Sequence, residues 1–98
     1  MYGTVARMRI KPGMEAQLRQ LSREFEEANI PGYLFEYVYR LDSGGNEYLV
    51  VAGFESREAY RANAEDPKQH ARYLQYRALL EADPEWSDGE IVYAYRRG

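Results

Sequence analysis

Four segments of the chain alternate apolar and polar residues in the two-residue period of a β-strand. They are Tyr2–Ile10, Tyr33–Leu41, Glu47–Glu55 and Glu90–Arg96. The second and third are separated only by the polar, glycine-containing stretch 42–46, which is typical of the turn of an antiparallel hairpin. We therefore expect four strands, two of them joined as a hairpin.

Three other segments carry apolar residues every three or four positions, which is the period of an amphipathic helix. The spacing predicts helices over Met14–Ala28, Arg57–Ala64 and Pro67–Ala82. Ser56 and Asp66 precede the last two helices and can cap them, and a proline suits the first helical position. We expect the last strand to follow a short loop that contains Trp86.

The predicted order is β-α-β-β-α-α-β, the split βαβ pattern of a ferredoxin-like α+β fold with its second helix broken in two. Right-handed crossovers place all helices on one face of a four-stranded antiparallel sheet. The length of 98 residues fits one domain, 1–98.

Strand alternation divides the side chains between the two faces of this sheet. We expect the helices to cover a face made of Ala6, Met8, Ile10, Phe35, Tyr37, Tyr39, Tyr48, Val50, Ala52, Phe54, Ile91, Tyr93 and Tyr95. The other face then carries Val5, Leu34, Val38, Leu49, Val51, Val92 and Ala94 among Arg7, Arg9, Glu36, Arg40, Glu55 and Arg96. No helix remains to cover this half-apolar face, so we expect a second copy to pack against it as a homodimer. The alternative is a monomer with a solvated sheet.

Composition narrows the class of protein. The net charge is −3 with no long basic run, and no apolar stretch is long enough to span a membrane, so neither nucleic acid nor membrane is expected as a partner. The absence of cysteine excludes thiolate chemistry and agrees with a cytoplasmic protein. Ten tyrosines favour either an aromatic core or a pocket for a flat aromatic ligand.

Several segments resemble the antibiotic biosynthesis monooxygenase family of dimeric α+β barrels. They are Lys11–Glu15 after the first strand, Pro31–Tyr33 before the second, Phe54–Ala59 after the third, and Asp66–His70, which is similar to the Ser-Pro-x-x-His segment of the family. The resemblance implies a homodimer with a pocket between sheet and helices in each subunit. It also implies an oxygenase acting on quinols or polyketide-like phenols without metal or flavin, or a haem-degrading relative.

The chain departs from the family pattern at several positions. Phe54 stands where members often have tryptophan, and Asn63 where they often have histidine. Haem-degrading members use an asparagine, a tryptophan and a histidine. The asparagine position is Ala6 here, and only His70 can match the histidine. Haem chemistry is therefore the least supported of the family's activities, and no cofactor is expected.

The candidate catalytic residues are His70 and Asn63. Histidine is the side chain whose charge changes near neutral pH, so His70 is a candidate general base or acid on a helix that borders the family's pocket. Asn63 can hydrogen-bond a substrate carbonyl. Either residue can equally be a surface residue near a helix end. Phenols that can line the pocket are Tyr37, Tyr39, Tyr73 and Tyr93, and core packing explains them equally well.

A lone histidine gives no metal-site spacing, and Gly44 and Gly45 lie at a hairpin tip and not in a phosphate loop. The sequence thus favours a cofactor-independent monooxygenase acting on a small phenolic or quinol substrate. The alternative is a non-catalytic dimeric barrel that binds a small aromatic molecule, with a haem-binding relative third.

Overall fold

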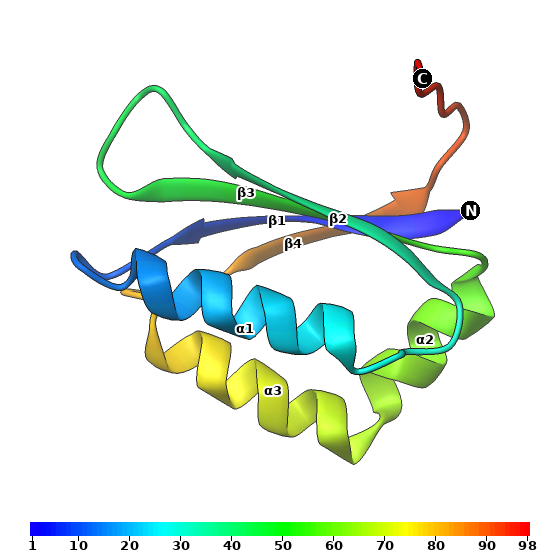
Figure 1. Cartoon of the computed structure of the whole chain (residues 1–98), viewed down its shortest axis with the longest axis horizontal. Coiled ribbons are helices and arrows are strands. Elements are labelled where there is room, and N and C mark those ends of the chain that lie inside the picture. Colours follow the sequence, from blue (N-terminus) through cyan, green and yellow to red (C-terminus); the bar gives the residue numbers. More distant parts are fainter.

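A computed structural model describes all 98 residues of the chain (Figure 1). The strands and helices follow the predicted order β-α-β-β-α-α-β. They are β1 (Tyr2–Arg9), α1 (Glu15–Glu27), β2 (Tyr33–Arg40), β3 (Glu47–Phe54), α2 (Arg57–Glu65), α3 (Pro67–Ala78) and β4 (Glu85–Glu90).

The four strands form one antiparallel sheet in the order β2-β3-β1-β4. All three helices lie on the same side of this sheet (Figure 1). The predicted ferredoxin-like α+β architecture is therefore confirmed. None of the helices is long and apolar enough to cross a bilayer.

The core lies where β1 and β3 meet the helices. Alternate residues of both strands are buried there, and α1 contributes Leu18 to the same cluster. Its members are Ala6, Met8, Ile10, Leu18, Tyr48, Val50 and Leu80. This is the helix-covered face that the alternation of β1 and β3 predicts.

The caps of the last two helices are those expected from the sequence. The Ser56 hydroxyl accepts a hydrogen bond from the Ala59 amide at 3.1 Å, and the Asp66 carboxylate accepts one from the Lys68 amide at 2.9 Å. Each cap satisfies an amide that has no partner inside its helix, and Pro67 at the first position of α3 has no amide hydrogen to satisfy.

The helix α3 ends at Ala78, one turn before the predicted Ala82. The residues that follow the helix contact the end of β1. Leu80 forms an isolated antiparallel bridge with Ile10, and the Glu81 amide donates to the Arg9 carbonyl at 3.0 Å. Leu80 is only 1% exposed, so burial of this leucine against the sheet replaces the last helical turn.

A β-bulge in β2 overturns the predicted faces of that strand. Tyr33 pairs with Phe54 of β3, but Phe35 pairs with Gly53, so Leu34 is an extra residue. A slip of one residue moves every later side chain to the opposite face. The bulge therefore turns Glu36 toward the helices.

Two tyrosines of β2, Tyr37 and Tyr39, consequently lie on the helix-free face. Tyr37 pairs with Val51 and Tyr39 with Leu49, and the two phenols are 52% and 54% exposed. The expectation that they face the helices was wrong. The ring of Phe35 lies on the same face over Gly53, where any Cβ would collide with it.

The last strand is also shifted from its predicted position. β4 covers Glu85–Glu90, not Glu90–Arg96. Its last pair joins Glu90 to Tyr2 at the beginning of β1, and the Ile91 amide donates to the Met1 carbonyl at 2.9 Å. Since β1 offers no further partner, residues 91–98 leave the sheet as a tail without regular structure, on the side away from the helices in the view of Figure 1. In this tail, Tyr93 is 82% exposed.

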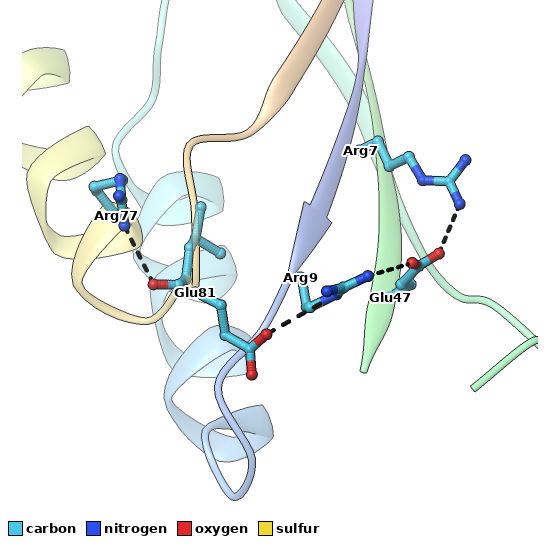
Figure 2. Close-up of polar contacts among 6 residues, drawn as sticks. Arg7, Arg9, Glu47, Arg77 and Glu81 are labelled. Carbon is cyan, nitrogen blue, oxygen red and sulfur yellow. Dashed lines mark hydrogen bonds and ion pairs between the residues drawn. The ribbon is translucent and has the colours of Figure 1, made fainter. Parts of the chain in front are cut away.

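The helix-free face carries a charged network at the end of β1. Figure 2 shows Arg7 and Arg9 reaching the Glu47 carboxylate at 2.6 and 3.0 Å, with Glu81 on the other side of Arg9. Hydrogen bonds from both arginines lower the pKa of Glu47. These charges are therefore paired within the chain.

Candidate functional site

The main cavity, of about 480 Å³, lies between the sheet and the helices. The backbone of α2 approaches β1 and β3, whereas α3 approaches mainly α1 and α2. The space between α3 and the sheet is therefore left to side chains and to the cavity. Residues from all four strands and all three helices line it, and most of them are apolar.

The floor of the cavity is one transverse row of the sheet. Glu36 pairs with Ala52, Ala52 with Thr4, and Thr4 with Asp88, so these four residues lie side by side on strands β2, β3, β1 and β4. All four line the cavity. The two central side chains are small, which leaves room above them. Three strand spacings separate the backbones of the two carboxylate residues, roughly 14 Å.

The helix α3 supplies one wall. His70, Tyr73 and Tyr76 recur every three residues along it and all line the cavity. From His70 to Tyr76 the helix rises by about 9 Å. Asn63 reaches the same cavity from the end of α2. His70, the candidate base, and Asn63, the candidate hydrogen-bond donor to the substrate, therefore line the same cavity.

An aromatic pair closes the side of the cavity toward β4. The centroids of the Tyr73 and Trp86 rings lie 6.4 Å apart, and both rings line the cavity. Trp86 belongs to β4, opposite Ala6, and not to a loop as expected. The place of Trp86 in the cavity wall offers a flat ligand two rings to stack against.

A cluster of hydroxyls surrounds Glu36. The hydroxyls of Ser22 and Tyr76 lie 3.1 Å apart. Burial raises the pKa of Glu36, and hydrogen bonding by Ser22 and Tyr33 offsets part of that rise. Burial, with the nearby Glu36 charge, raises the pKa of Tyr76 to about 12. The tyrosine therefore stays a neutral phenol at physiological pH, and Glu36 is the group of this cluster that can ionise.

A second polar group lies at the opposite end of the floor. The Tyr60 hydroxyl donates to the Asp88 carboxylate at 2.9 Å. Burial, and after it this hydrogen bond, raise the pKa of Tyr60 to about 12. This end of the cavity therefore presents a neutral phenol held by a carboxylate.

The structure brings together only some of the residues predicted from the sequence. His70, Asn63 and Tyr73 line the cavity. Tyr37 and Tyr39 lie on the other face of the sheet, and Tyr93 lies in the tail, so none of the three reaches it. The helical residues were placed correctly because their period is regular. The strand residues were misplaced by the bulge and by the shift of β4.

Sequence reasoning missed Glu36 and Asp88 as parts of the site. The only available signal for Glu36 was that it is the one acidic residue within the aromatic strand Tyr33–Arg40. Without knowledge of the bulge, alternation assigns it to the wrong face. No group of three or more carboxylate or imidazole side chains lies close enough together to hold a metal ion.

Comparisons with known proteins identify relatives with the same architecture. A variant of SnoaB, a cofactor-independent oxygenase from Streptomyces nogalater, superposes with a TM-score of 0.80 at 18% identity, covering 98% of this chain and 97% of that one. A protein from Chloroflexus aurantiacus, described as a candidate antibiotic biosynthesis monooxygenase, gives a TM-score of 0.77 at 23% identity over 99% and 98% of the two chains.

A similarly described protein from Deinococcus radiodurans gives a TM-score of 0.78 at 18% identity, over 100% of this chain and 99% of that one. At these identities the likeness shows a shared fold. Among curated proteins, none matches the chain. The family model described as antibiotic biosynthesis monooxygenase matches residues 1–73 of the 98. The chain therefore belongs to the antibiotic biosynthesis monooxygenase family.

Proposed function

We propose that this protein is a cofactor-independent monooxygenase that acts on a small phenolic or quinol substrate. The observation that carries the proposal is the common placement of His70 and Asn63 on one largely apolar cavity. Aromatic walls around such a cavity suit a flat ligand, and a few polar groups fix its orientation. Family membership supports the same reaction class.

In the proposed reaction His70 removes the proton from a hydroxyl of the bound substrate. The O–H bond breaks, the proton passes to the imidazole, and the substrate becomes an electron-rich anion that reacts with dioxygen. One oxygen atom enters the substrate. The other leaves as water with two hydrogens of the substrate, which is thus the only reductant.

Asn63 has the supporting role in this scheme. Its amide can donate a hydrogen bond to an oxygen of the substrate or of the oxygenated intermediate, because it lines the cavity from the α2 side. Tyr73 and Trp86 form the wall against which the ring of the substrate stacks. Asn63 would therefore act on the position of the reacting oxygen and not on the proton.

A second candidate function is binding of a small aromatic molecule without turnover. The observation in its favour is that His70 is exposed and takes part in none of the ion pairs of the chain. A general base is usually oriented by a further group, and none of the carboxylates does so here.

Oxygen uptake with a panel of quinols tests the first proposal. We expect the wild type to consume dioxygen and His70→Ala to lose roughly 100-fold or more of the rate, the usual contribution of general base catalysis. The matched control is Gln75→Ala, an exposed position of the same helix that does not line the cavity. Uptake unaffected by His70→Ala would reject the mechanism. Tight binding of the same quinols with no uptake would establish the second candidate.

We further propose that the protein works as a homodimer. Val5, Tyr37 and Tyr39 are exposed on the face of the sheet that no helix covers. Val92 and Tyr93 are exposed in the tail that leaves this sheet. A second copy of the chain would remove these apolar groups from water.

A further inference from the structure

Glu36 is a carboxylate of the cavity to which the proposed reaction assigns no role. The bulge at Leu34 turns it toward the helices, and it lines the cavity at the β2 end of the floor. A strand that would otherwise present tyrosines to this space presents one acid. The bulge of β2 is therefore the cause of the position of Glu36 in the cavity.

No cation balances this carboxylate. The ion pairs of the chain use Glu47, Glu81 and Asp83, and none includes Glu36. A half-buried carboxyl without a cation is costly unless hydrogen bonds satisfy it. The groups that surround it are the hydroxyls of Ser22, Tyr33 and Tyr76. A carboxyl has more hydrogen-bonding positions than Ser22 and Tyr33 can fill, so capacity remains for a ligand.

The position of Glu36 relative to His70 sets a length. Tyr76, whose pKa the nearby Glu36 charge helps to raise, lies six residues beyond His70 on α3, and the corresponding rise is about 9 Å. Tyr73 lies between them on the same helix face, and Trp86 stands beside it toward β4. A ring system that lies along α3 past Tyr73 would therefore extend from the imidazole toward the carboxyl.

We propose that Glu36 binds the oxygen at the end of the ligand remote from His70, so that the cavity selects elongated aromatic molecules with a hydroxyl group at each end. Glu36 exchanges a hydrogen bond with that hydroxyl, and Ser22 and Tyr33 hold the carboxyl in place. The inference rests on the proposed function only in taking this cavity as the ligand site, because it requires binding and no turnover.

Two probes that differ by one hydroxyl test the inference. Biphenyl-4,4′-diol carries a hydroxyl at each end of its long axis, and biphenyl-4-ol carries one. Titration calorimetry gives the dissociation constants of both for the wild type, Glu36→Leu, Glu36→Gln and the control Glu24→Gln on the exposed side of α1. We expect the wild type and the control to bind the diol about tenfold more tightly, the usual value of one added hydrogen bond.

In Glu36→Leu the preference for the diol should disappear, whereas in Glu36→Gln most of it should remain because an amide still exchanges a hydrogen bond. Binding of biphenyl-4-ol by each variant demonstrates an intact cavity. A diol preference that survives Glu36→Leu, or that is absent from the wild type, overturns the inference. Failure of quinol oxygenation with the diol preference intact would reject the monooxygenase and leave the role of Glu36 standing.

Discussion

Three ionisable groups around the cavity, Glu36, Tyr60 and Tyr76, hold their protons more tightly than they would in water. Burial is the largest cause of the raised pKa of each of them. The two phenols therefore remain hydrogen-bonding groups and do not become anions at neutral pH. Of these three groups, Glu36 is the one that can carry a charge toward a ligand, and burial raises its pKa.

The raised pKa of Glu36 predicts a dependence of stability on pH. The folded chain binds this proton more tightly than the unfolded chain, where the ordinary value is 4.5. The stabilisation is fully present below that value and is lost as the pH rises through the pKa of the folded state. Glu36→Gln should therefore gain stability relative to the wild type as the pH increases.

Urea unfolding of both proteins between pH 4 and pH 8, the range of about half a unit below to several units above the ordinary pKa, measures this effect. Comparing the two proteins cancels the opposite contribution of Glu47, whose lowered pKa makes the fold more stable as the pH rises. Glu24→Gln, on the exposed side of α1, is the control. A constant difference between wild type and Glu36→Gln across this range would contradict the assigned burial.

Alternation assigned the side chains of β1 and β3 to the correct faces and misassigned those of β2 and β4. His70 and Tyr73 could be placed on one face because the helical period of α3 continues unchanged for several turns. Tyr37 and Tyr39 could not be placed, since one extra residue, Leu34, reverses every later side chain of the strand. Nothing in the local composition distinguishes the bulged strand from a regular one.

At the scale of elements, the end of α3 is decided by packing and not by helix propensity. The residues after Ala78 remain compatible with a helix up to Asp83–Pro84, and for that reason the sequence predicts a longer one. The structure instead places Leu80 beneath the sheet next to Ile10. Burial of one leucine offsets the loss of a helical turn.

Replacement of Leu80 by alanine should therefore be severe. Leu80 is 1% exposed, so truncation leaves a cavity in the core and should reduce the free energy of unfolding by about 2–5 kcal/mol. Leu74→Ala, at a position of α3 that is 54% exposed, should cost less than about 1 kcal/mol. Urea denaturation measures both. Equal losses would show that Leu80 is not a core residue.

The position of β4 illustrates the same principle in the sheet. The segment 90–96 has the stronger apolar alternation, whereas Glu85–Glu90 is mostly polar. Strand formation nevertheless follows the hydrogen-bonding partner. All of Glu85–Glu90 pairs with β1, ending opposite Tyr2 at the beginning of that strand. The apolar segment that follows extends beyond the ladder. The existence of a fourth strand could be predicted from the sequence, and its register could not.

At the scale of the whole molecule, the topology was predictable because it depends on element order and handedness, which the pattern preserves. The composition of the helix-free face was not, because it depends on the bulge and on the register of β4. The face nevertheless remains half apolar: Phe35, Tyr37 and Tyr39 take the places expected for Glu36, Val38 and Arg40. The helix-free face therefore still exposes apolar side chains that a second copy of the chain could cover.

We expect sedimentation velocity at micromolar concentration to show a dimer. Tyr37→Asp with Tyr39→Asp should convert it to a monomer, because two charges would be buried in the interface. Gln17→Asp, on the exposed side of α1, should leave the dimer intact. A monomeric wild type at these concentrations would refute the proposed association, while the cavity within each chain would keep its lining.

The place of Trp86 has a practical consequence. It is the only tryptophan of the chain, it is 51% exposed, and its ring forms part of the cavity wall beside Tyr73. Molecules that enter the cavity would displace water from this indole and move its emission toward shorter wavelengths. The protein thus contains an intrinsic optical reporter of cavity occupancy, and ligand screens can be run on the unlabelled chain.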